Sequence, residues 1–234
     1  MGIKITAHLL SSPVVMDDWS PSIDGILEWS ILDRLGLLQP NPTREECEKN
    51  APIIAENMPL EKGEISGNWY WKCSSPCYFY EIEYTTQINK RWSPIEDGNP
   101  PEWGKRKQKW DSQSGPDKAY RLPLFERVIS QIDWYLVGDI DRILDLLNSI
   151  KTIGKKGSYG NGQVLKWEAK EIGSDWHLWG PNGELMRPIP VGAIDRPTSF
   201  AIKQWGIRPP GRLHQIRCAM PTNTVQPRND AVSS

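Results

Sequence analysis

The chain has 234 residues, enough for one large domain or two small ones, and its 38% hydrophobic and 24% charged content is typical of a globular protein. No run of 18 apolar residues exists and the first residues lack a signal-peptide core, which argues against a membrane helix and predicts a cytoplasmic protein. The net charge of −1 hides an asymmetry, because residues 1–64 are acid-rich whereas residues 187–217 carry six Lys and Arg against one acid.

The first third of the chain predicts a strand, a helix and an irregular stretch. Residues 3–10 alternate between apolar and polar side chains, the pattern of a half-buried strand. Ser20-Pro21 is a helix start, with Ser at the cap and Pro at the first helical position, and Gly36 ends the helix. Residues 39–64 contain four prolines and no sustained period, so we expect an irregular or partly helical insertion.

The middle of the chain predicts three strands and a long surface excursion. Residues 69–73 and 78–88 are rich in aromatic and β-branched side chains, and Ser74-Ser75-Pro76 between them suggests a hairpin. From about residue 90 to residue 120 the pattern dissolves into Pro, Gly, Ser and charged residues, which indicates a surface loop. A third strand is predicted over residues 128–136.

A helix and a final strand complete the predicted domain. Gly138-Asp139 precedes a helical apolar pattern that Gly154 stops, and residues 163–172 read as the closing strand. This order of elements is that of an α+β, ferredoxin-like (RRM-like) domain over residues 1–172, with a thumb-like insertion at about 90–120. Residues 173–221 predict a smaller β-rich region packed on this domain, and residues 222–234 predict a disordered tail.

The most distinctive motif is the segment 154–162, GKKGSYGNG, in which four glycines alternate with two lysines and a tyrosine. Glycine allows backbone N–H groups to approach a phosphate closely, and lysines add positive charge. The loop leaves a helix and enters a strand, the reverse of the order in nucleotide-binding P-loops and Rossmann turns. The alternative is a simple helix stop followed by a flexible turn.

A glycine-rich loop between the second helix and the last strand of a ferredoxin-like domain resembles the RAMP superfamily of CRISPR proteins. Within it, residues 23–27 (IDGIL), 187–191 (RPIPV) and 208–210 (RPP) look similar to the type IV subunit that caps the guide RNA. The resemblance implies a non-catalytic subunit that binds the 5′ handle of the guide RNA (crRNA). It also implies docking to a backbone RAMP subunit and a large subunit of the effector complex.

The same resemblance implies which residues contact RNA. In the glycine-rich loop they are Lys155, Lys156, Gly157, Ser158, Tyr159 and Gly160. In the thumb-like insertion they are Lys105, Arg106, Lys107, Lys109 and Trp110, cations and rings that pair phosphates and stack on bases. Near the C-terminus they are Arg208, Arg212 and His214. The alternative for the insertion is a solvated charged loop.

Catalysis and metal binding are not expected. Some RAMP proteins are metal-independent endoribonucleases that need a base for the ribose 2′-OH, but His8, His177 and His214 lie outside the first helix. Cys73 and Cys77 resemble half a zinc site, yet the other cysteines are scattered, and four cysteines in so long a chain do not make a disulfide framework. We therefore expect no cofactor. The alternatives are a guide-RNA-processing endoribonuclease and a protein-interaction module without RNA.

Overall fold

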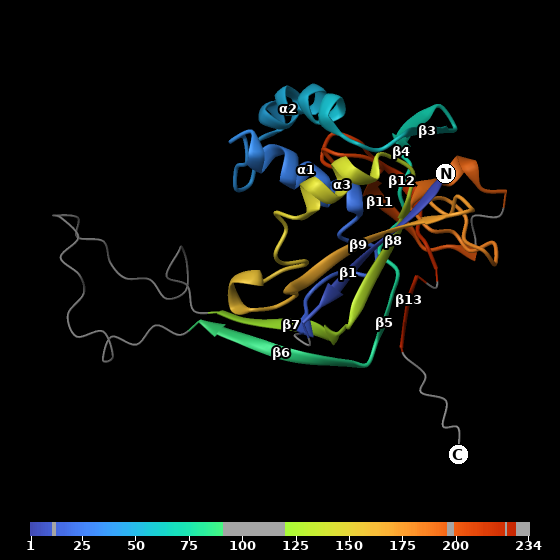
Figure 1. The fold of residues 1–234 in the computed structure, drawn as a ribbon. Coiled ribbons are helices and arrows are strands. Elements are labelled where there is room, and N and C mark those ends of the chain that lie inside the picture. The colour runs from blue at the N-terminus through green and yellow to red at the C-terminus, as the bar shows by residue number, and fades with distance from the viewer. Residues whose placement is uncertain (11–12, 91–119, 196–198, 223, 228–234) are drawn as a thin grey trace, which may run out of the picture. The chain divides into compact units, whose positions relative to one another are not determined.

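A computed structural model describes residues 1–10, 13–90, 120–195, 199–222 and 224–227 (Figure 1). The chain divides into two compact units, one of Met1–Ile82 with Arg127–Ser234 and one of Glu83–Glu126. The first unit is a mixed α+β structure and contains the helices and most strands. No helix among the described residues is both long and apolar enough to cross a membrane.

The central sheet of the first unit has β1 (Gly2–Leu9) between β8 (Gln131–Leu136) and β9 (Val164–Ile172), antiparallel to both. Ile5 of β1 lies opposite Trp134 of β8 and Ala169 of β9. The odd-numbered side chains of β1 are buried, as their alternation predicts. The strand predictions for residues 3–10 and 163–172 are therefore confirmed.

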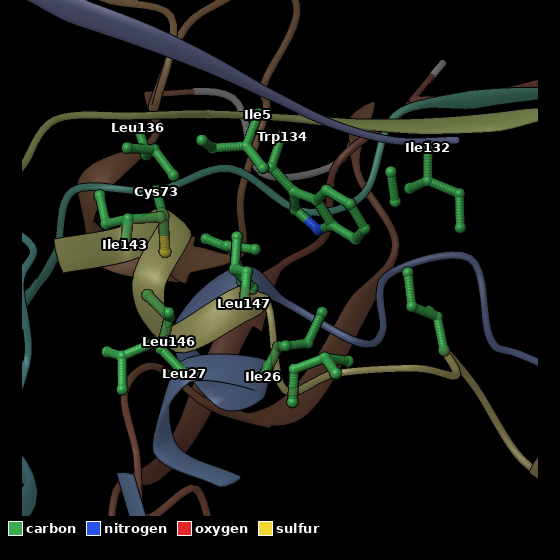
Figure 2. Packing of buried hydrophobic residues seen from close by; sticks show 14 of the residues in the cluster. Ile5, Ile26, Leu27, Cys73, Ile132, Trp134, Leu136, Ile143, Leu146 and Leu147 are labelled. Atoms are coloured by element: carbon green, nitrogen blue, oxygen red, sulfur yellow. The ribbon is translucent and has the colours of Figure 1, made fainter. Parts of the chain in front are cut away.

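Helices α1 (Ile23–Arg34) and α3 (Ile140–Leu147) close this core. Figure 2 shows Leu147 of α3 next to Ile5 and Trp134 of the sheet, and Leu27 of α1 belongs to the same buried cluster. Burying each such side chain contributes about 1.5–3 kcal/mol. Asp139 caps α3 as predicted, because its carboxylate accepts a hydrogen bond from the N–H of Arg142.

One helix start differs from its prediction. Helix α1 begins at Ile23, with Ser22 at the N-cap position in place of Ser20. The stretch expected to be irregular or partly helical is partly helical, because it holds α2 (Arg44–Asn57), which continues through Pro52. Thr43 and Glu46 form a capping box, each side chain bonding the other's backbone N–H, and this signal outweighs the proline.

The predicted hairpin between residues 69–73 and 78–88 is wrong. Strand β4 (Asn68–Trp71) pairs instead with β3 (Lys62–Ile65), across a Ser66-Gly67 turn in which both residues have positive φ. The segment at residues 73–77 forms antiparallel bridges to β8, and β5 (Tyr78–Tyr80) pairs in parallel with β13 (Val225–Pro227). Residues 225–227, within the tail predicted to be disordered from residue 222, therefore form a strand.

The remaining strands flank the predicted insertion. Strands β6 (Ile82–Lys90) and β7 (Tyr120–Val128) are neighbours in a sheet, and most of both belongs to the second unit. In the first unit, β2 (Pro13–Val14) pairs with Arg127 and Val128. The predicted strand 128–136 thus divides between β7 and β8. Residues 91–119, with the expected contacts Lys105, Arg106, Lys107, Lys109 and Trp110, lie outside the described residues.

The region after β9 contains the strands of a second antiparallel sheet. Strand β12 (Gln215–Ala219) lies between β10 (Ile189–Pro190) and β11 (Ile202–Gly206) in an antiparallel sheet. A short 3₁₀ helix, η2 (Val191–Ala193), follows β10. Leu185, Ile189 and Ala219 form a small core of their own.

Candidate nucleic-acid interface

The glycine-rich loop of residues 154–162 is tied to the segment around β2. The N–H of Lys155 donates to the carbonyl of Val15 at 2.7 Å, and the N–H of Gly162 donates to the carbonyl of Pro13 at 3.0 Å. The N–H of Ile153 also donates to Gly162 O at 2.8 Å. These bonds hold both ends of the loop, so the structure argues against a purely flexible turn.

Two glycines of the loop are required by the way its backbone packs. Gly154 has φ +84°, and a Cβ there would lie 2.6 Å from the Val15 carbonyl oxygen. Gly162 has φ +63°, and its Cβ would lie 1.9 Å from the Ile153 carbonyl oxygen. These two glycines are required by the loop's own anchors, so glycine richness alone is not evidence for a phosphate.

The tip of the loop presents cations and a ring to solvent. The Lys155 side chain is 68% exposed and lies 3.7 Å from an exposed Asp17 carboxylate, a weak pairing. Lys156 Nζ lies 5.7 Å from the centroid of the Tyr159 ring, and Tyr159 is 69% exposed. The structure thus places Lys156 beside Tyr159 and leaves the side chain of the adjacent Lys155 exposed to solvent.

The backbone at this tip offers unused donors. Lys156 is in the left-handed region (φ 68°, ψ 29°) and leads into the right-handed 3₁₀ turn η1 (Gly157–Tyr159). The N–H groups of Lys156, Gly157 and Ser158 donate to no acceptor within the described part of the chain. A left-handed residue followed by a right-handed one turns successive N–H groups toward a common point, where they can bind an anionic oxygen.

A groove of about 340 Å³ opens beside the first residue of this loop. One wall comes from α1 and the residues before it, and the other wall is the connection between α3 and the loop. The lining residues are Pro21, Gly25, Ile26, Trp29, Ile150, Lys151, Thr152, Ile153 and Gly154. Trp29 is 43% exposed, so part of its ring faces solvent. No local pattern in the sequence indicates this groove, because its walls are far apart in the chain.

The predicted contacts near the C-terminus are engaged elsewhere. Arg208 Nη1 donates to the Trp69 carbonyl at 2.9 Å, and its guanidinium lies 4.2 Å from the centroid of the Trp69 ring. Arg212 Nη1 donates to the Pro42 carbonyl at 2.7 Å. His214 is half-buried, and its carbonyl accepts from Ile207 N. Figure 1 shows β11 and β12, which this turn connects, away from the loop at the start of β9.

The basic character of residues 187–217 is therefore partly structural. Arg187 is only 5% exposed, and its guanidinium donates to three backbone carbonyls, those of Trp71, Cys73 and Ile207. It also lies 4.4 Å from the centroid of the Tyr70 ring. A buried guanidinium that is bonded to backbone carbonyls is not available to phosphate, and no local pattern in the sequence indicates that this cation is internal.

The open face of the central sheet carries charges that pair with one another. Asp133 Oδ2 lies 2.8 Å from Lys4 Nζ, and Asp133 Oδ1 accepts from the Thr6 hydroxyl at 2.6 Å. Glu168 Oε2 lies 3.1 Å from His8 Nε2 and 3.1 Å from Lys166 Nζ. Because these cations already have carboxylate partners, the sheet face is a weaker phosphate site than the loop.

The third histidine is structural. His177 is buried, with Nδ1 2.5 Å from Asp175 Oδ1 and Nε2 3.1 Å from the Tyr70 hydroxyl. Burial lowers its pKa, in spite of the opposing effect of Asp175. Cys73 and Cys77 lie along the segment bridged to β8, and burial raises the pKa of both thiols. Within the described ranges, no three His, Cys, Asp or Glu residues cluster as metal ligands would.

The geometry defines a mixed α+β protein that presents one basic and aromatic loop beside a partly apolar groove. Comparison with known protein families matches residues 2–210 to the family described as CRISPR type IV associated protein Csf3. The molecule is therefore a type IV CRISPR-associated protein. More narrowly, the chain belongs to the Csf3 family. A search of curated proteins finds no match.

Proposed function

We propose that this chain is a non-catalytic, cytoplasmic guide-RNA-binding subunit of a type IV CRISPR ribonucleoprotein complex. In this role it caps the 5′ handle of the guide RNA and docks a backbone RAMP subunit, next to a large subunit. The observation that carries the proposal is the loop tip, where Lys155 and Tyr159 are exposed, Lys156 is half-buried, and the backbone has unused N–H groups. Such donors and cations suit phosphate, and an exposed ring suits a base.

The sheet order supports the ferredoxin-like interpretation and, with it, the RAMP assignment. The chain runs β1, α1, the segment 73–77, β8, α3 and β9, once the α2 and β3–β4 insertion is set aside. In space, β9, β1 and β8 are neighbours, and residues 73–77 bridge the free edge of β8. This order supports a β-α-β-β-α-β domain in which residues 73–77, predicted to contain a hairpin turn, take the place of the second strand.

A salt titration with loop variants tests the RNA proposal. Binding of labelled 5′-handle RNA should weaken steeply between 50 and 200 mM salt, on the order of tenfold or more, because phosphate contacts release counterions. The double variant Lys155→Ala with Lys156→Asn should weaken binding by roughly 1–3 kcal/mol with little change in melting temperature. Asn is used at residue 156 because it tolerates the left-handed conformation without a positive charge.

The matched control is Lys170→Ala, which removes an exposed lysine from the open face of the sheet. It should leave RNA affinity within about twofold, since a single solvated cation away from phosphate contributes little. Equal losses of RNA affinity in the control and the loop variant would indicate that RNA also binds the sheet face. A wild-type chain that binds no RNA, even with its partner subunits, would favour a protein-interaction module instead.

The non-catalytic part of the proposal has its own test. Incubation of repeat RNA with the chain in the absence of metal should leave the RNA intact, because the His8 imidazole pairs with Glu168 on the sheet and no histidine lies on α1 or the loop. Specific cutting that disappears in His8→Ala would replace the proposal with the guide-RNA-processing endoribonuclease.

A further inference from the structure

The groove beside the glycine-rich loop combines an aromatic wall with an unpaired backbone edge. Trp29 supplies a ring that is 43% exposed, from α1. Facing it, residues 151–153 pair with residues 162–164 through the carbonyl of Lys151 and the N–H of Ile153, and the Ile150 carbonyl accepts from the Trp167 indole of β9. The N–H and carbonyl of Thr152 therefore point away from residues 162–164, and neither has a partner in the described part of the chain.

Gly25 is the second observation that points to an occupant. It lies in the first turn of α1, and glycine is a poorer helix former than alanine. A Cβ at this position would meet only the Ser22 hydroxyl, at an ordinary 3.4 Å, so no neighbour in the described chain requires glycine. Because Gly25 lines the groove, a methyl group there would fill space that the folded chain leaves open.

We propose that this groove holds one nucleobase of the guide-RNA handle, stacked on Trp29 and edged by the Thr152 backbone. The groove ends at Gly154 and the cationic tip begins at Lys155, so one strand of RNA can place a phosphate on the tip and an adjacent base in the groove. The Thr152 N–H and carbonyl offer a donor and an acceptor side by side, which match the polar edge of a base. An apolar side chain in the groove would leave both groups without a hydrogen bond. The inference rests on the proposed RNA function and specifies where a base sits.

The test uses handle RNA in which one nucleotide at a time is replaced by an abasic ribose, with binding measured by fluorescence anisotropy. Trp29→Ala should weaken binding of the intact RNA roughly tenfold or more, and Trp29→Phe should restore most of the affinity. One abasic RNA should bind wild-type protein more weakly by a similar factor and be insensitive to Trp29→Ala. This non-additivity identifies the base that contacts the ring.

Gly25→Ala separates a ligand role from a structural one. It should raise the melting temperature, because alanine stabilises the helix, and lower RNA affinity, because its methyl group occupies the groove. Trp179→Ala is the matched control, since Trp179 has the same 43% exposure but does not line the groove. It should leave RNA affinity unchanged.

Three results would overturn the inference. If Trp29→Ala and Gly25→Ala leave RNA affinity unchanged while the Lys155 and Lys156 variant loses it, the proposed function stands and the base site does not. If Trp29→Ala weakens every abasic RNA as much as the intact one, the groove holds no base. If wild-type protein binds no handle RNA, the base site and the proposed function fail together.

Discussion

Glu28 provides a sharp test of the electrostatics of α1. Its carboxyl group is largely removed from water, and Asp24 lies one helical turn before it. Burial, with a smaller effect from the Asp24 carboxylate, raises the pKa of Glu28 from 4.5 to about 7. The folded chain therefore keeps a proton that the unfolded chain releases above pH 4.5, and folding loses stability as pH rises from 4.5 through 7.

Each tenfold change in an ionisation constant is worth about 1.4 kcal/mol, so this pKa rise sets an upper limit of about 3 kcal/mol. Glu28→Gln keeps the shape of the side chain and cannot ionise. We expect the variant to be more stable than wild type by about 1–3 kcal/mol at pH 8, and by much less at pH 4.5. Urea unfolding at the two pH values measures both differences.

Glu45→Gln is the control, because Glu45 is an exposed carboxylate in the first turn of α2. It should not become stabilising as pH rises. A Glu28→Gln effect that is the same at pH 4.5 and pH 8 would show that the side chain is solvated in the folded state, and would refute the reasoning. A second variant, Asp24→Asn, should reduce the Glu28→Gln effect at pH 8, since it removes the neighbouring charge.

Two further predictions concern groups that the structure assigns to folding. Burial lowers the pKa of His177 below its ordinary value of 6.5. As the pH falls below 6.5, the unfolded chain therefore binds a proton before the folded chain does, and the stability of the fold declines. His177→Gln should lessen this decline in thermal melts between pH 7.5 and 5.5. Arg208→Ala should lower the unfolding free energy by about 1–3 kcal/mol, because it removes a carbonyl hydrogen bond and stacking on Trp69. Arg212→Ala should change the unfolding free energy by less than about 0.5 kcal/mol, because Arg212 is exposed. Unchanged melting of the Arg208 variant, together with lost RNA affinity, would restore Arg208 as an RNA contact.

Local patterns determined the elements that carry the core. The alternation in β1 and β9 and the Asp139 cap of α3 are properties of neighbouring residues, and the structure has each where the sequence predicts it. The glycine-rich loop was found in the same way, because its composition is local. Thr43 and Glu46 have the spacing of a capping box in the sequence, but the prolines of that stretch argued against a helix.

Tertiary structure alone decided which strands pair and which charges are free. The 69–73 segment pairs with β3 and not with the strand after it, because partner choice depends on what the whole sheet buries and not on the strand's own pattern. Arg208 was predicted as an RNA contact and Arg187 lies in the same basic region, yet each is bonded to backbone carbonyls of β4 or the residues after it. Whether a cation meets water or carbonyl oxygens is set by distant segments, and the groove between α1 and residues 150–154 exists only because the folded chain brings them together.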